Sequence, residues 1–154
     1  MPSDASPLQD TEFVGAILDL LIPPRADGRV PGAGALGLAE TVAADLTADA
    51  SYGSRVESGL AAVRDAACEQ DPEGFLALAG EDRLAVFRAQ QQEHPALERG
   101  LVHYLYLAYY QHPTVLVGLG QPARPPFPEG NEIEQTDPEL LALLESRRLS
   151  APDA

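Results

Sequence analysis

Apolar residues recur every three or four positions along most of this chain, and this spacing limits the possible folds more than any other feature. The first run, Phe13 to Leu21, follows a potential helix cap at Asp10 and stops at Pro23. Such spacing places apolar side chains on one face of an α-helix. Signals for β-strands are almost absent, because only Thr114 to Leu119 has a short β-like character. The sequence therefore predicts an all-α protein.

Five or six helices can be placed within residues 11–119, and we expect them to pack as an irregular bundle. They are centred on the following apolar runs: Phe13–Leu21, Leu38–Leu46, Tyr52–Ala67, Phe75–Leu78, Leu84–Phe87 and Leu101–Tyr110. Ser51 is positioned to cap the third run. The last run is apolar on all sides, which is typical of a helix surrounded by protein on most sides. We therefore expect it at the centre of the domain.

The character of the chain changes after residue 119. Residues 120–136 are rich in proline, which favours an extended arm. Asp137 and Pro138 then begin a short helix over residues 137–148, followed by a tail at 149–154. At the other end, residues 1–10 are expected to be disordered. The expected architecture is a helical domain over 11–119 with an extended Pro-rich C-terminal arm and a short final helix.

The chain is strongly acidic, with 24 acidic residues against 10 arginines and a formal net charge of −14. This charge repels nucleic acids and anionic lipids, so we expect neither as a partner. No apolar stretch reaches the ~20 residues needed to cross a bilayer, so we expect no membrane insertion. Residues 1–10 do not resemble a secretion signal, and the only arginine pair is Arg147-Arg148. These features predict a cytoplasmic protein.

The usual signatures of a cofactor, a metal or a catalytic centre are weak in this sequence. Gly32 to Gly37 matches the dinucleotide-binding pattern G-x-G-x-x-G, but the Pro- and Gly-rich segment before it cannot form the required buried strand. His94, His103 and His112 lack the acidic partners of a di-iron bundle. The single cysteine, Cys68, excludes an internal disulfide, and its Ala-rich surroundings predict a buried thiol. We therefore expect no catalytic, cofactor-binding or metal site.

The tyrosines are more informative candidates for a functional surface. His103, Tyr106 and Tyr110 share one helical stripe. Such rings belong either to the core, with hydroxyls reaching the surface, or to an interface, where tyrosine combines apolar area with a hydrogen-bonding tip. The Pro-rich arm is likewise either a linker or a strap across a partner, and its aromatic residue favours a strap. The candidate interface comprises His103, Tyr106, Tyr109, Tyr110, His112, Arg124, Pro125, Pro126 and Phe127.

A series of short segments stands in a particular order along residues 13–110. The segments are Leu20-Leu21-Ile22-Pro23-Pro24, Asp27-Gly28, Pro31-Gly32-Ala33, Tyr52, Gly59-Leu60-Ala61-Ala62, Phe75-Leu76-Ala77-Leu78 and Glu81-Asp82-Arg83. Together they resemble the gluconate 2-dehydrogenase subunit 3 family. The resemblance implies a small non-catalytic subunit that partners a large FAD-containing oxidoreductase of the glucose-methanol-choline type and assists its maturation or export. On this resemblance the FAD belongs to the partner, and this chain carries no cofactor.

The chain departs from the family pattern in two respects. Family members commonly carry a twin-arginine leader, which residues 1–10 do not resemble, and the usual family ending is replaced by the Pro-rich arm and the final helix. We expect an accessory subunit that stabilises a flavin-dependent sugar or alcohol oxidoreductase. Two alternatives remain open: a homodimeric structural protein that uses the same face on itself, and a small enzyme in which His103 and either Tyr106 or Tyr110 act as acid and base.

Overall fold

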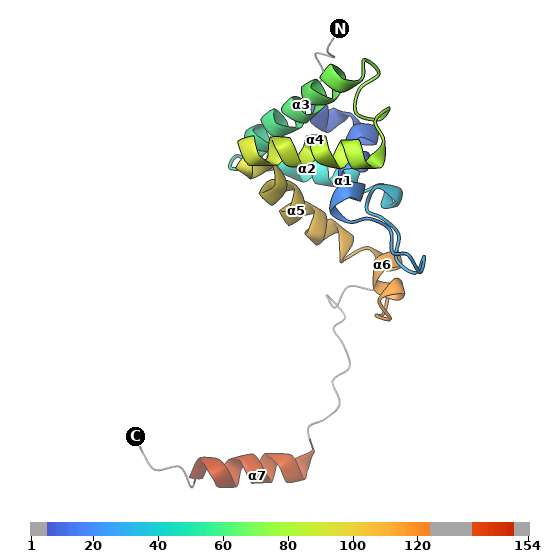
Figure 1. The fold of residues 1–154 in the computed structure, drawn as a ribbon. Coiled ribbons are helices and arrows are strands. Elements are labelled where there is room, and N and C mark those ends of the chain that lie inside the picture. Colours follow the sequence, from blue (N-terminus) through green and yellow to red (C-terminus); the bar gives the residue numbers. More distant parts are fainter. Residues whose placement is uncertain (1–5, 124–136, 150–154) are drawn as a thin grey trace. The chain divides into compact units, whose positions relative to one another are not determined.

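The computed structural model describes residues 6–123 and 137–149, which contain helices, turns and loops but no β-strand. The prediction of an all-α protein is confirmed. In chain order the elements are the 3-10 helix η1 (Pro7–Gln9), α1 (Thr11–Leu21), the 3-10 helix η2 (Gly34–Leu36), α2 (Ala39–Ala48), α3 (Gly53–Gln70), α4 (Gly80–Glu93), α5 (Pro95–Tyr109), α6 (Pro113–Gly118) and α7 (Pro138–Leu149). The chain divides between Arg124 and Pro125 into two units, of which the first is a helical domain and the second contains α7 (Figure 1).

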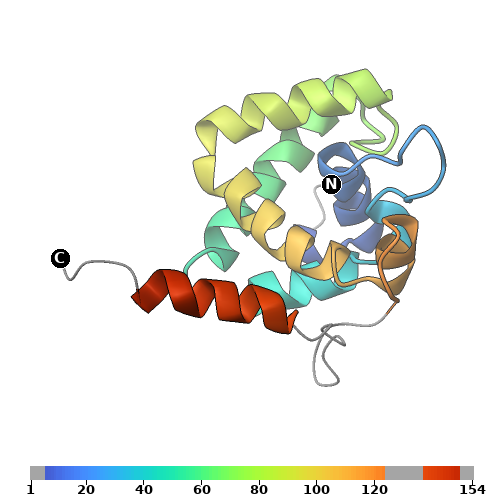
Figure 2. The ribbon, with the colours of Figure 1, turned by 90° about the horizontal axis from the view of Figure 1, so that it is seen from below.

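The helical domain is built around one apolar core. Helices α1 to α5 group together, with α6 directly after α5 (Figures 1 and 2). Helix α5 packs against α2, α3 and α4 and also contacts α1. The largest fully buried side chains are aliphatic: Ile17, Leu18, Leu46, Leu60, Leu97, Leu101 and Leu105. Burial of these side chains away from water supplies the main stabilisation of the domain.

The start of α1 follows the sequence prediction. The carboxylate of Asp10 accepts a hydrogen bond from the backbone N–H of Phe13 at 3.0 Å, which satisfies a donor that the helix itself leaves free. Phe13, Val14, Ile17 and Leu18 are buried, as their spacing predicts. The same periodicity that identifies this helix therefore also determines which side of it enters the core.

The glycines of the G-x-G-x-x-G pattern have a packing role in this structure. The backbone N–H of Gly34 donates to the Asp19 carboxylate at 2.8 Å, which ties the loop before η2 to the side of α1. A Cβ at Gly34 would lie 2.5 Å from the carbonyl oxygen of Gly15, and one at Gly32 would lie 2.4 Å from Asp19 Oδ1. Glycine is needed here because the loop approaches α1 so closely.

The segment with β-like character, Thr114 to Leu119, is helical over most of its length. Residues Pro113–Gly118 form α6, whose first turn is started by Pro113. The side chain of His112 accepts a hydrogen bond from the backbone N–H of Thr114 at 3.3 Å. A Cβ at Gly118 would lie 2.4 Å from the carbonyl oxygen of Arg29, so α6 is packed tightly onto that loop. Capping and tertiary packing outweigh the β-propensity of its valines.

The chain near its N-terminus also differs from the prediction. Residues 7–9 form η1, and Leu8 is only 6% exposed because it packs into the core, so the expected disorder is wrong for these residues. Residues 1–5 lie outside the described part of the chain. Ser51 does not cap α3, because the N-cap residue is Tyr52 and no side chain makes a capping hydrogen bond there. In the turn before the helix, the Asp49 carboxylate accepts from the backbone N–H groups of Ser51 and Tyr52.

The thiol of Cys68 is exposed, which corrects the expectation of a buried cysteine. Cys68 follows Ala67, which is fully buried on the core side of α3. Successive side chains of an α-helix lie about 100° apart around its axis, so the side chain of Cys68 points away from the core side on which Ala67 is buried. The Ala-rich composition around a residue therefore does not show which side of a helix it occupies.

Helix α7 stands in the second unit and is described by itself. It covers the predicted final helix, and the Asp137 carboxylate accepts from the backbone N–H of Glu139 at 2.9 Å. The predicted arm falls mostly on residues 124–136, which lie outside the described ranges, as do residues 150–154. In the part of the chain that the structure describes, none of the helices combines the length and apolarity needed to cross a membrane.

Candidate functional site

The inner side of α5 is held firmly against α3. A Cβ at Gly100 would lie 2.4 Å from Val56 Cγ2, and a Cβ at Gly59 would lie 3.0 Å from Leu97 Cβ. The two helices can therefore approach closely only because each has a glycine at the contact. Leu97, Leu101 and Leu105 follow on the same side and are fully buried. This packing fixes the rotation of α5 about its own axis, and so decides which side chains point outward.

The opposite side of α5 carries large apolar side chains that remain exposed. Tyr106, Leu107 and Tyr110 keep 47%, 48% and 48% of their surface exposed, and the rings of Tyr106 and Tyr110 meet edge to face at 5.5 Å. We define the outer face of α5 as Arg99, Val102, His103, Tyr106, Leu107 and Tyr110. The expectation that this helix is surrounded by protein on most sides is therefore corrected for this face.

A shallow groove of about 700 Å³ runs beside the outer face. Its lining combines most of that face with two residues at the junction of α2 and α3, Asp49 and Tyr52. An open groove with aromatic and aliphatic walls and a few polar groups resembles the surfaces that proteins offer to other proteins more than it resembles an enclosed ligand pocket.

Tyr104 fastens α5 to this junction. Its hydroxyl donates a 2.6 Å hydrogen bond to Asp49 Oδ2. This bond, together with the backbone N–H of Ser51, holds the pKa of the Asp49 carboxyl below its usual value. The pKa of the Tyr104 hydroxyl is raised for the reciprocal reason, because its proton is held by a carboxylate. One wall of the groove is thus positioned by a charge-assisted hydrogen bond.

Two of the predicted interface residues have structural roles. Tyr109 is 4% exposed and its hydroxyl donates to the carbonyl oxygen of Pro31 at 2.8 Å, while burial raises the pKa of that hydroxyl. His112 caps α6 with its side chain. The structure brings His103, Tyr106 and Tyr110 together on the outer face, whereas the predicted residues of the arm, at 124–127, lie outside the described ranges.

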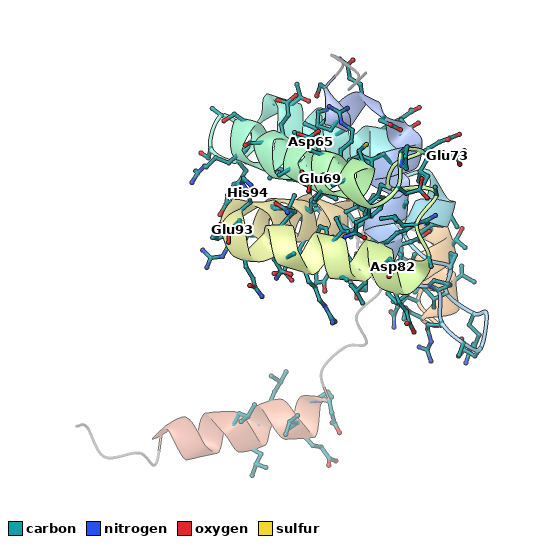
Figure 3. The ribbon with its side chains drawn as sticks, turned by 45° about the horizontal axis from the view of Figure 1, so that its top comes forward. Asp65, Glu69, Glu73, Asp82, Glu93 and His94 are labelled. Atoms are coloured by element: carbon teal, nitrogen blue, oxygen red, sulfur yellow. The ribbon has the colours of Figure 1, made fainter. Side chains whose placement is uncertain are left out.

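The charge pattern around α5 is a signal that the helical periodicity does not reveal. From Arg99 to Pro128 the sequence contains no Asp or Glu, although the chain carries 24 acidic residues. By contrast, the side formed by α3 and α4 displays Asp65, Glu69 and Asp82 (Figure 3). The outer face of α5 carries one charged side chain, Arg99, and no acidic one. The gap in the acidic residues would have added Arg99 and Leu107 to the candidates.

Aromatic rings at and beside the outer face contact one another edge to face. The centroids of the His103 and Tyr104 rings lie 4.9 Å apart. Across residues 6–123 and 137–149, no three His, Cys, Asp or Glu side chains are arranged to hold a metal ion. Half-exposed tyrosines beside an arginine are the side chains that most often dominate binding between proteins.

These features define an all-α protein with an exposed aromatic helix face on its helical domain. The family model described as gluconate 2-dehydrogenase subunit 3 matches residues 9–122, and the chain belongs to this family. The resemblance seen in the short motifs is thereby confirmed. No curated protein matches the chain, and no solved structure matches it. The family is named for a subunit of a dehydrogenase.

Proposed function

We propose that this chain is a non-catalytic accessory subunit that binds and stabilises a large FAD-dependent oxidoreductase of the glucose-methanol-choline type, acting on a sugar or an alcohol. The observation that carries the proposal is the outer face of α5, within a family of dehydrogenase subunits. The flavin belongs to the partner, and the role of this chain is to cover apolar surface of the partner that would otherwise face water.

The contacts of α5 support a rigid docking surface. The inner side is locked by close packing on α3, and Tyr104 is tied to Asp49, so the outer side chains are presented on a fixed frame. Tyrosine side chains lose little conformational entropy on binding because they have few rotatable bonds. A pre-organised aromatic face therefore binds more tightly than the same residues on a mobile loop.

The test is co-expression with a large FAD-dependent oxidoreductase subunit of the glucose-methanol-choline type. Three preparations are compared for soluble yield and flavin content of the large subunit: the large subunit alone, with the wild-type chain, and with Tyr106→Glu. We expect the wild-type chain to raise both quantities and to co-purify with the large subunit. Tyr106→Glu should weaken binding at least about tenfold, because it places a charge in the apolar centre of the contact.

Leu76→Glu is the matched control, since Leu76 is also an exposed apolar residue, at 41%, but stands in the loop between α3 and α4 and does not line the groove. It should bind like the wild type. A large subunit that is soluble and fully loaded with flavin in the absence of this chain would overturn the proposal. Light scattering of the chain alone provides the second readout, because a stable dimer that Tyr106→Glu dissolves would assign the face to a second copy.

A further inference from the structure

Helix α7 carries an apolar side that remains exposed. Leu140, Leu141, Leu143 and Leu144 retain 48%, 48%, 49% and 53% of their surface exposed. Leu140 and Leu144 are four positions apart and therefore share one side of the helix, with Leu141 and Leu143 flanking them. Four half-exposed leucines within five residues form a broad apolar stripe, which we call the leucine stripe.

An isolated helix of this length has little stability in water. Helices shorter than about 12–15 residues are marginal unless one side packs against another surface. α7 has 12 residues, and its N-terminal turn is capped by Asp137. The start of α7 is thus defined by a capping residue, but the stability of the helix must come mostly from burial of the leucines. The leucine stripe is consequently a surface that gains stability when it binds.

The position of α7 in the chain separates it from the shared part of the family. The family match ends at residue 122, whereas α7 begins at Pro138. The helix is therefore an element of this chain beyond the segment that the family model describes.

A second copy of this chain and a membrane surface are both disfavoured as partners of the leucine stripe, by the small area that α7 could bury and by the net charge of the chain. Two copies of a 12-residue helix would bury well under the ~1,200 Å² that stable specific interfaces need, and each copy brings a net charge of −14. Helices that lie on membranes rely on basic residues and anionic lipid, which this net charge repels. A protein that is already bound elsewhere by the same chain needs no large additional interface, because the covalent connection supplies an effective concentration on the order of millimolar.

We propose that α7 is a second anchor, which places its leucine stripe in an apolar groove of the same oxidoreductase subunit that the outer face of α5 binds. This inference rests on the proposed function and adds a second contact point to it. Helix-in-groove binding of this kind uses apolar anchors three and four residues apart, as Leu140, Leu141 and Leu144 are. The two anchors together form a bivalent grip, in which each slows dissociation of the other.

The experiment measures the Kd and dissociation rate of the full chain for the co-expressed oxidoreductase subunit. Leu140→Ala/Leu144→Ala should weaken binding at least about tenfold, mainly through faster dissociation, because two buried leucines are lost from the contact. Alanine is the best helix former, so the substitution keeps α7 helical. Leu140→Met/Leu144→Met should bind like the wild type, since methionine restores the apolar area. Leu76→Ala/Val117→Ala removes comparable exposed apolar area from the helical domain and should leave Kd unchanged.

The outcomes separate this inference from the proposed function. If Tyr106→Glu weakens binding and the double alanine variant of α7 does not, the second anchor is overturned and the outer face of α5 stands. If the wild-type chain does not bind the oxidoreductase at all, both proposals fall. Leucine-dependent dimerisation in light scattering, or leucine-dependent flotation with phosphatidylglycerol vesicles, would assign α7 to a second copy or to a membrane and would equally overturn the inference.

Discussion

The two sides of α5 differ more than any other pair of surfaces in the domain. On the inner side, Gly100 and the buried leucines leave no room for an extra carbon atom. On the outer side, Tyr106, Leu107 and Tyr110 stand half exposed with nothing of the described domain covering that half. The same 15-residue helix therefore stabilises the fold with one side and leaves the other exposed, and we propose the exposed side as the binding surface. Substitutions on the two sides should have opposite consequences for stability and for partner binding.

The largest contrast is expected between two leucines of α5. Leu101→Ala should lower the free energy of unfolding by about 2–5 kcal/mol, because it removes a fully buried side chain and leaves a cavity. Leu107→Ala should change it by no more than about 0.5 kcal/mol, because Leu107 is half exposed. Urea denaturation followed by far-UV circular dichroism measures both. Equal destabilisation by the two variants would break the division of α5 into a structural and a binding side.

Two glycines at the first position of a helix extend the comparison of crowded and open sites. A Cβ at Gly53, which begins α3, would lie 2.4 Å from the backbone oxygen of Leu46, whereas a Cβ at Gly80, which begins α4, would meet nothing within 4 Å. Gly53→Ala should therefore cost about 1–3 kcal/mol of stability. Gly80→Ala should be neutral or slightly stabilising, since it restricts the unfolded chain without a clash. Thermal unfolding of both variants measures the difference in stability. A Gly53→Ala protein as stable as the wild type would contradict the prediction and would show that the junction of α2 and α3 can shift to make room for a Cβ.

Adjacent tyrosines give a finer comparison. Tyr109→Phe removes the hydroxyl that donates to the Pro31 carbonyl and should cost about 1 kcal/mol of stability. Tyr110→Phe should leave stability unchanged, because the Tyr110 ring is half exposed. Chemical denaturation of the two variants in parallel provides the measurement. A larger loss for Tyr110→Phe would mean that its hydroxyl, and not that of Tyr109, fastens the end of α5.

The smallest expected effect concerns acid stability at the groove. The folded-state pKa of Asp49 lies below its ordinary value of 3.8, so the ionised carboxyl stabilises the fold above that pH, and the contribution is lost as the pH falls through the folded pKa. Tyr104→Phe removes the largest cause of the lowered pKa. The variant should be less stable than the wild type at about pH 7, and the difference should shrink at about pH 3.

Urea titrations of both proteins at the two pH values test this expectation. Tyr110→Phe is the control, since Tyr110 is not among the groups that lower the pKa of Asp49, and it should follow the wild type at both pH values. The same change at Tyr52 would be less suitable, because Tyr52 also lines the groove. A Tyr104→Phe protein whose deficit stays constant, or grows, on acidification would separate the acid response from the Asp49 carboxylate.

Much of the fold was predictable because its signals are local. The capping of α1 by Asp10, the apolar spacing from Phe13 to Leu18 and the family motifs all concern residues within a few positions of one another. Two elements that local signals did not indicate, η1 and α6, depend on distant contacts. Leu8 is ordered by the core it enters, and α6 is held by its packing on the loop at Arg29. Neither contact can be predicted from the residues next to it in the sequence.

The candidate site was predictable only in part for the same reason. The cluster of tyrosines identified α5 as the helix of interest, but periodicity alone could not separate Tyr109, which is buried, from Tyr110, which is exposed. Two adjacent residues lie about 100° apart on a helix, so a rotation of α5 by about that angle would bring Tyr110 into the environment of Tyr109. The absence of acidic residues after Arg99 is visible in the sequence, yet its meaning emerges only when the exposed side is known.

By itself the sequence determined that the chain is helical, acidic and related to dehydrogenase subunits, since periodicity, charge and motif order are properties of the chain in one dimension. The tertiary structure alone decided which side of α5 faces outward. The physical reason is the close approach of α5 and α3 at Gly100 and Val56: it sets the rotation of α5, and this rotation places Tyr109 against Pro31 while Tyr106 and Tyr110 remain at the surface.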